Sequence, residues 1–95
     1  MRSRSEQWLF RLYVAGDGSL SRNARENLER LCLEYLKDAY RIEVVDLLKQ
    51  PGLAREHGLI ATPMVVRESP VPIRKVVGDL SNAGRALFHL KLGYI

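Results

Sequence analysis

A proline at the entrance to an apolar run constrains the fold of this chain more than any other feature. In the stretch 61–66, Ala-Thr-Pro-Met-Val-Val, Pro63 directly precedes residues that favour a strand. A cis peptide bond is common only before proline, so the Thr62-Pro63 bond predicts a cis turn that leads into the strand. The stretch 73–82 follows, and it predicts another strand, a Gly-Asp turn and a helix with Ser81 as its N-cap.

The first half of the chain predicts a βαβ unit. Residues 8–14 are apolar at nearly every position and predict a central strand, whereas the alternation at the start of 40–48 indicates a strand at a sheet edge. Between them, helical spacing of apolar residues predicts a helix that runs to about Lys37 and is capped by Ser19 or Ser21. Two strands joined by a helix in this way are parallel, with a right-handed crossover.

The second half predicts two helices that flank a pair of strands. A short helix over 51–57 begins with a proline and is ended by Gly58. The strand after Pro63 and a strand over 73–77 follow, and the last helix reaches Leu92.

Together these elements predict a single α/β domain over residues 1–95, of which residues 1–6 are a polar N-terminal tail. The element order βαβαββα is that of a thioredoxin-like fold, whose second half carries a cis-proline before a strand. A chain of this length buries one core, with little surplus.

Charge and cysteine content exclude several classes of protein. The chain carries a net charge of +4, but acidic and basic residues are interleaved, and no basic stripe with aromatics indicates a nucleic-acid partner. The polar N-terminus is not followed by a long apolar run, which argues against a signal peptide and a membrane partner. The single cysteine excludes an intramolecular disulfide and favours a reducing, cytoplasmic location.

The sequence offers little for catalysis. Cys32 lies among the apolar positions of the first helix, so we expect a small buried hydrophobe rather than a reactive thiol. A redox enzyme of this fold places its nucleophile at the strand-to-helix turn, where this chain has Asp17-Gly18-Ser19. His57 and His89 have no neighbouring cysteine or paired carboxylates. We therefore expect no enzyme activity, no metal and no cofactor.

Two acidic features have plain structural interpretations. Asp46 and Asp79 are either a carboxylate pair or separate residues, with Asp79 shaping the turn before Ser81. The segment Gly16-Asp17-Gly18 stands at the start of a helix, where an anion can bind, but no nearby lysine or longer glycine pattern accompanies it. We interpret it as a turn.

Four segments occur in the order and spacing of one known family, and on them the chain resembles the KaiB family of circadian-clock proteins over almost its whole length. No single segment is decisive, and the four in register carry the resemblance. They are Leu12-Tyr13-Val14-Ala15-Gly16, Val44-Val45-Asp46-Leu47-Leu48-Lys49-Gln50-Pro51, Ile60-Ala61-Thr62-Pro63 and Val77-Gly78-Asp79-Leu80-Ser81-Asn82.

The resemblance implies a protein that is not an enzyme and uses no cofactor. KaiB proteins bind the N-terminal ATPase ring of the KaiC hexamer, and the complex captures further clock components, such as a KaiA-like protein or a histidine kinase. Family members occupy two folds: a ground-state fold of order βαββααβ, usually tetrameric, and a monomeric thioredoxin-like fold that binds KaiC. The sensor domain of a clock histidine kinase is an alternative identity, and a thioredoxin-family redox protein is another.

The resemblance also assigns partner-binding residues. The KaiC-facing set, from the short second helix and the proline-rich hairpin, comprises Gln50, Pro51, Ala54, Pro63, Val71, Pro72 and Arg74. The edge set on the second strand, which recruits a further clock protein, comprises Arg41, Ile42 and Glu43. An edge strand suits this role because its backbone groups are ready to pair with another chain. From the residues alone, prolines that stiffen a loop and a solvated arginine explain the first set equally well.

The last segment fits two conformations, because it presents an apolar face both at helical spacing and at period two. The helical face is Ala83, Leu87, Leu90 and Tyr94, and the period-two face is Phe88, Leu90, Leu92 and Tyr94. Family members that rest in the ground state carry glycine and aspartate at the positions of His89 and Lys91. Histidine and lysine are better helix formers than glycine, and lysine suits a helix C-terminus. We therefore predict that this chain rests mainly in the monomeric thioredoxin-like state.

Overall fold

The computed structural model describes residues 7–56, 58 and 61–92. The elements in chain order are β1 (Trp8–Val14), α1 (Ser19–Leu36), β2 (Tyr40–Asp46), α2 (Pro51–Glu56), β3 (Met64–Ser69), β4 (Arg74–Val77) and α3 (Ala83–Leu90). The predicted order βαβαββα is confirmed. The predicted tail at 1–6, together with His57, Ile60 and Tyr94, lies outside the described residues.

The four strands form one sheet with the order β2-β1-β3-β4. β1 and β2 are parallel, in register from Trp8 opposite Tyr40 to Val14 opposite Asp46. β3 is antiparallel to β1, and β4 is antiparallel to β3. β2 therefore lies at an edge, as its alternating sequence predicts, and β1 is central, as its apolar run predicts.

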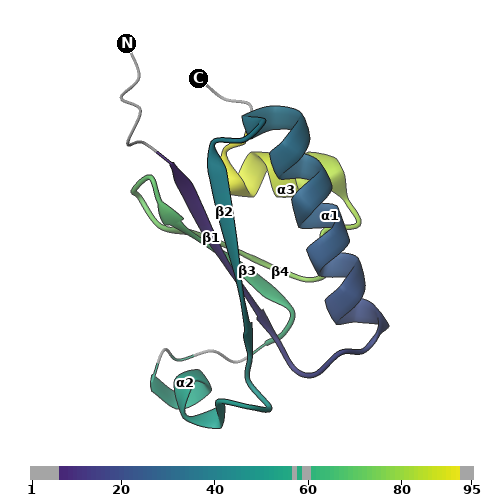
Figure 1. The fold of residues 1–95 in the computed structure, drawn as a ribbon, viewed down its shortest axis with the longest axis vertical. Coiled ribbons are helices and arrows are strands. Elements are labelled where there is room, and N and C mark those ends of the chain that lie inside the picture. The colour runs from purple at the N-terminus through teal and green to yellow at the C-terminus, as the bar shows by residue number, and fades with distance from the viewer. Residues whose placement is uncertain (1–6, 57, 59–60, 93–95) are drawn as a thin grey trace.

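The two faces of the sheet carry separate cores. Helices α1 and α3 cover one face, and α2 packs on the other face near one end of the strands (Figure 1). The larger core lies under α1 and α3 and contains the fully buried Phe10 and Leu12. The smaller core joins Tyr13 and Met64 to Leu53 of α2. Side chains of β1 serve different cores because a strand alternates its side chains between faces.

The first helix begins without a serine cap. Gly18 is its N-cap and makes no side-chain hydrogen bond, and Ser19 is already its first helical residue, so the prediction of a cap by Ser19 or Ser21 is wrong. The helix ends at Leu36, close to the predicted end, and β2 ends at Asp46 rather than at residue 48.

The turn before α3 is one residue longer than predicted. The Asp79 Oδ1 atom accepts a hydrogen bond from the Ser81 N–H over 3.0 Å, so Asp79 shapes this turn as predicted. Ser81 itself is not the cap. The N-cap is Asn82, whose side chain accepts a hydrogen bond from the Arg85 N–H over 3.0 Å.

The end of α3 also differs from the prediction. The helix stops at Leu90 because Lys91 adopts the left-handed conformation, with φ 59°. The Leu92 N–H then donates to the Leu87 carbonyl over 3.1 Å, as in a Schellman helix end. The prediction that the helix reaches Leu92 is therefore wrong, although Leu92 is buried in the larger core.

The predicted cis bond between Thr62 and Pro63 is present. The bonds Ser69-Pro70 and Val71-Pro72 are cis as well, which the sequence did not indicate. Within the described residues, no helix combines the length and the apolar character needed to span a membrane.

Candidate partner-binding site

Four residues of the KaiC-facing set lie at one end of the sheet, the end at which α2 packs (Figure 1). Gln50 and Pro51 are exposed at the start of α2, and Ala54 packs partly against the smaller core. Pro63 is buried at the entrance to β3, beside a hollow of about 370 Å³ that it shares with the loop before α1. We name these four residues, Gln50, Pro51, Ala54 and Pro63, the α2 patch.

The hairpin residues lie at the other end of β3. Val71 is 78% exposed and Pro72 is exposed as well. β3 separates this hairpin from Pro63, and its six residues span about 20 Å of extended chain. Val71, Pro72 and Arg74 therefore form a second surface, the hairpin patch, and the set predicted as one surface is divided in two.

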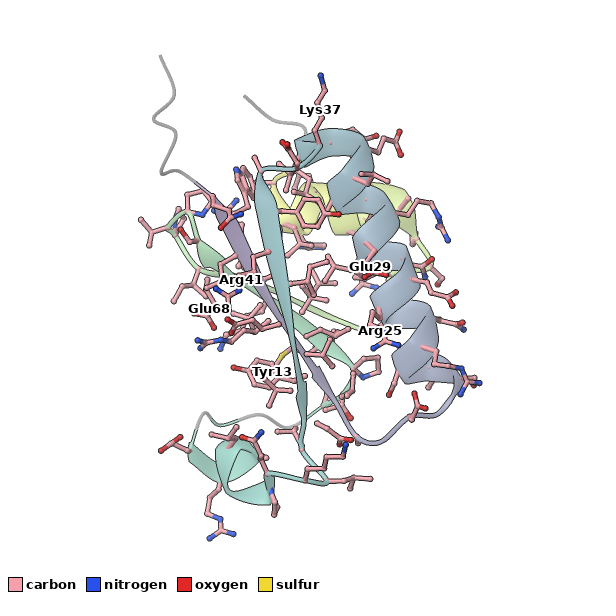
Figure 2. The ribbon with its side chains drawn as sticks, viewed as in Figure 1. Tyr13, Arg25, Glu29, Lys37, Arg41 and Glu68 are labelled. Atoms are coloured by element: carbon pink, nitrogen blue, oxygen red, sulfur yellow. The ribbon has the colours of Figure 1, made fainter. Side chains whose placement is uncertain are left out.

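The edge set lies on β2, which has β1 as its neighbour on one side only in the sheet order. Ile42 packs against the larger core, whereas Arg41 and Glu43 lie on the opposite face. Figure 2 shows Arg41 and Glu68 on the side of the sheet away from α1.

The charges on this open face already have partners. Glu43 pairs with Arg11 and with Arg41, each at 3.1 Å, and Arg11 also approaches Glu68 at 3.7 Å. The hydrogen bond to Glu43 raises the pKa of Arg11 above its ordinary value. The side-chain charges at the β2 edge are therefore already paired within this chain. A partner that binds at this edge would instead pair with the backbone of β2.

Asp46 organises the loop at the α2 end of the sheet. Its Oδ1 atom accepts hydrogen bonds from the Gly16 N–H over 3.0 Å and from the Leu48 N–H over 2.9 Å. These two bonds lower the pKa of Asp46 below its ordinary value of 3.8, and the bond from Gly16 has the larger effect. Gly16 has φ 83°, and a Cβ there would lie 3.1 Å from Leu48 Cδ1, so this turn requires glycine.

Asp46 is expected to make stability depend on pH. Because its pKa is lower in the folded state, its contribution is present above pH 3.8 and is lost as the pH falls through the lowered value. Asp46→Asn should therefore reduce the urea midpoint at pH 7 and shrink the difference between pH 7 and pH 2.5. Asp38→Asn, in the exposed turn before β2, is the matched control. A wild-type pH dependence in Asp46→Asn would contradict this role.

Asp46 and Asp79 are separate residues rather than a carboxylate pair. Asp46 ends β2 and Asp79 follows β4, which are the two opposite edges of the sheet. The backbone carbonyl of Asp79 accepts a hydrogen bond from Asn27 Nδ2 over 2.7 Å, which links its turn to α1. Both aspartates therefore shape turns.

A second hollow, of about 430 Å³, lies between the loop before α1 and the end of β2. Arg22, Arg25 and Lys49 line it together with Asp17 and Asp46. The sequence showed no lysine near the Gly16-Asp17-Gly18 turn, but the fold brings Lys49 to it from beyond β2. The Arg22 Nη1 atom donates to the Asp17 carbonyl over 2.7 Å and so supports the turn.

Cys32 is fully buried in the larger core, as predicted. Burial raises the pKa of its thiol to about 12, with the charge of Glu29 adding to the effect. A redox nucleophile needs a populated thiolate and access to its substrate. Cys32 has neither, so its role is packing. Among the described residues, no group of three possible metal ligands comes together.

The two predicted fold-state residues lie at the end of α3. His89 is exposed in the last turn, edge-on to the ring of Phe88 at 5.3 Å between centroids. The Lys91 Nζ atom lies 4.4 Å from the Phe88 ring centroid. Lys91 is the left-handed C-cap, so its helix propensity does not apply, whereas a positive charge on the C-cap residue still suits the negative end of the helix dipole.

Sequence reasoning missed Arg67. It lies in β3 among buried apolar residues and is itself only 4% exposed. It stands opposite Arg74 of β4, so these two side chains share the face that α3 covers. The available signal was periodicity, because Arg67 follows the core residue Val65 by two positions.

Comparison with known proteins agrees with the predicted resemblance. A model of the KaiB domain matches residues 11–92. The chain is 36% identical over 84 residues to the circadian clock protein KaiB3 of Synechocystis sp., covering 88% of this chain and 82% of that protein. It is 38% identical over 87 residues to the circadian clock oscillator protein KaiB of Thermostichus vulcanus, covering 92% and 81% respectively.

Solved structures identify the fold. The N-terminal domain of Synechococcus elongatus SasA superimposes with a TM-score of 0.73 at 17% identity, over 100% of this chain and 94% of that one. Mitochondrial thioredoxin 3 of Saccharomyces cerevisiae gives 0.68 at 19% identity, over 93% and 80%. The predicted thioredoxin-like fold is therefore confirmed. Since the family model spans nearly the whole sheet and its three helices, this chain belongs to the KaiB family.

Proposed function

We propose that this protein is a non-enzymatic clock or regulatory protein that binds the N-terminal ATPase ring of a KaiC-type hexamer. The observation that supports it most strongly is the arrangement of the second half of the chain. In this family the thioredoxin-like form is the one that binds KaiC, and the described residues of the second half, 51–56 and 61–92, have that arrangement here. The bound complex would then recruit or displace a KaiA-like or histidine-kinase component at the β2 edge.

The proposed binding surface consists of the α2 patch and the hairpin patch. Both carry exposed residues beside proline, which holds a loop in a defined conformation and so lowers the entropy lost on binding. Val71 is a large apolar side chain exposed at the hairpin tip, which is the kind of residue that partners bury. The proposal assigns the ring contact to both patches, so changes at either one weaken it.

The test uses a purified KaiC-type hexamer under ATP turnover and measures complex formation by size exclusion and by titration. Wild type should form a complex, and Val71→Asp should weaken it by about tenfold or more, as expected for the loss of a buried anchor. Gln50→Asp examines the α2 patch in the same way.

The matched control is Leu33→Asp, because Leu33 is 65% exposed but lies on α1, outside both patches. Its affinity should equal that of wild type. If wild type forms no complex while its spectra show the thioredoxin-like fold, the proposed function is wrong. If Leu33→Asp and Val71→Asp weaken binding equally, the proposed surface is wrong.

A further inference from the structure

The Arg67 guanidinium is a buried positive charge that has no acidic partner among the residues the structure describes. In the described part of the chain it forms no ion pair, and its Nε atom has no hydrogen-bond partner. The indole ring of Trp8 lies under it, with the guanidinium carbon 5.1 Å from the ring centroid. A buried charge is strongly disfavoured unless its surroundings compensate it, so its remaining contacts must carry that compensation.

Those contacts are two backbone carbonyls from different segments. Nη1 donates to the Leu90 carbonyl over 2.9 Å, and Nη2 donates to the Pro72 carbonyl over 2.8 Å. Leu90 is the last residue of α3, where carbonyls lack partners within the helix and the helix dipole is negative. Pro72 belongs to the hairpin patch. One planar group therefore holds both segments, since its donors have a fixed geometry.

We propose that Arg67 is a positioning residue that couples the docking of α3 to the conformation of the hairpin patch. This inference rests on the proposed function only where it treats that patch as a binding surface. The coupling runs in both directions: undocking α3 removes the Leu90 carbonyl that orients the guanidinium toward the Pro72 carbonyl, and a partner that holds the hairpin stabilises the docked helix.

Arg74 explains why the coupling depends on this geometry. It stands directly opposite Arg67, and its own Nε atom is buried with no hydrogen-bond partner in the described part of the chain. Burial first, and then the charge of Arg74, lower the pKa of Arg67. Two like charges side by side are tolerated only while the carbonyls stay in place. Loss of either carbonyl would leave a guanidinium N–H without its acceptor beside the charge of Arg74.

The experiment measures hydrogen exchange by NMR in the isolated protein for wild type, Arg67→Met, Arg67→Lys and Arg85→Met. Arg67→Met should raise the amide exchange rates of α3 and of the hairpin together. The increase in both segments should be about ten times larger than any increase in β1. Arg67→Lys should show a smaller coupled change than Arg67→Met, because an ammonium keeps the charge and can still donate hydrogen bonds. The change should not vanish, because an ammonium lacks the forked geometry of the guanidinium. Arg85→Met is the control, since Arg85 is exposed on the same helix, and it should change neither segment.

A measurement on wild type alone keeps the inference testable if Arg67→Met fails to fold. The guanidinium protons of Arg67 should exchange with solvent more slowly than those of Arg85. Equally fast exchange, or an Arg67→Met variant that loosens α3 without the hairpin, would overturn the coupling. Absence of ring binding by wild type would instead refute the proposed function and leave these measurements in the free protein standing.

Discussion

Replacing Leu90 by alanine is expected to lower the free energy of unfolding by about 2–5 kcal/mol, as for other fully buried leucines. Leu90 is fully buried where α3 meets the sheet. Alanine has a higher helix propensity than leucine, so the loss comes from packing alone. Domains of this size are stable by only about 5–15 kcal/mol, so the change removes a large share of the total.

Urea unfolding gives the size of the effect, and hydrogen exchange gives its location. We expect the amides of α3 to exchange faster in Leu90→Ala than in wild type, because the helix loses its main anchor. Phe88→Ala is the matched control in the same helix: Phe88 is 54% exposed and should cost at most about 1 kcal/mol, mostly its contact with Lys91. Equal losses in the two variants would show that Leu90 does not anchor α3.

The sequence predicted the elements well where one local signal dominated. The apolar run at 8–14 and the proline at 63 each specified a strand or its entrance, and the structure has both. One error lies where two residues offered the same chemistry. Ser81 and Asn82 can both cap a helix, and the Asp79 carboxylate decides between them by holding the Ser81 N–H. That choice depends on a turn, which propensity does not describe.

The candidate site was less predictable because it depends on tertiary arrangement. Residues 50–54, Pro63 and residues 71–74 are near in sequence, yet β3 carries the chain from one end of the sheet to the other between them. Arg67 was missed for a related reason. An arginine in a strand is usually exposed, and this one is buried where the end of α3, the hairpin and the Trp8 ring come together around it.

The double substitution His89→Gly with Lys91→Asp is expected to destabilise the docked α3 by about 1.5–3.5 kcal/mol. Glycine in place of histidine costs about 0.3–0.5 kcal/mol in a helix. Aspartate in place of Lys91 removes a favourable positive charge at the helix C-terminus and adds an unfavourable negative one, and each of these two changes costs about 0.3–1 kcal/mol. It also removes the contact with Phe88, worth about 0.5–1 kcal/mol. Two packings of one sequence can differ by only a few kcal/mol, so this shift can change which one dominates.

Backbone chemical shifts of residues 83–92 and the oligomeric state report the result. Wild type should be helical over Ala83–Leu90 and monomeric, whereas the double variant should gain an extended, tetrameric population. Lys91→Gly separates charge from conformation, because glycine accepts the φ of 59° at this position without strain. It should stay helical. An extended segment in wild type, or an unchanged double variant, would refute the prediction about His89 and Lys91.

The same equilibrium sets the affinity for a KaiC-type ring under the proposed function. The apparent dissociation constant is the intrinsic one divided by the fraction of chain in the binding-competent state. If wild type rests in the thioredoxin-like state, that fraction is close to one and binding follows a single phase that depends on concentration. In the double variant, chains in the other fold must first convert, and once that fold dominates, each further 1.4 kcal/mol of shift toward it should weaken apparent binding about tenfold. A slow phase that does not depend on concentration should appear beside it, and Lys91→Gly should bind without one.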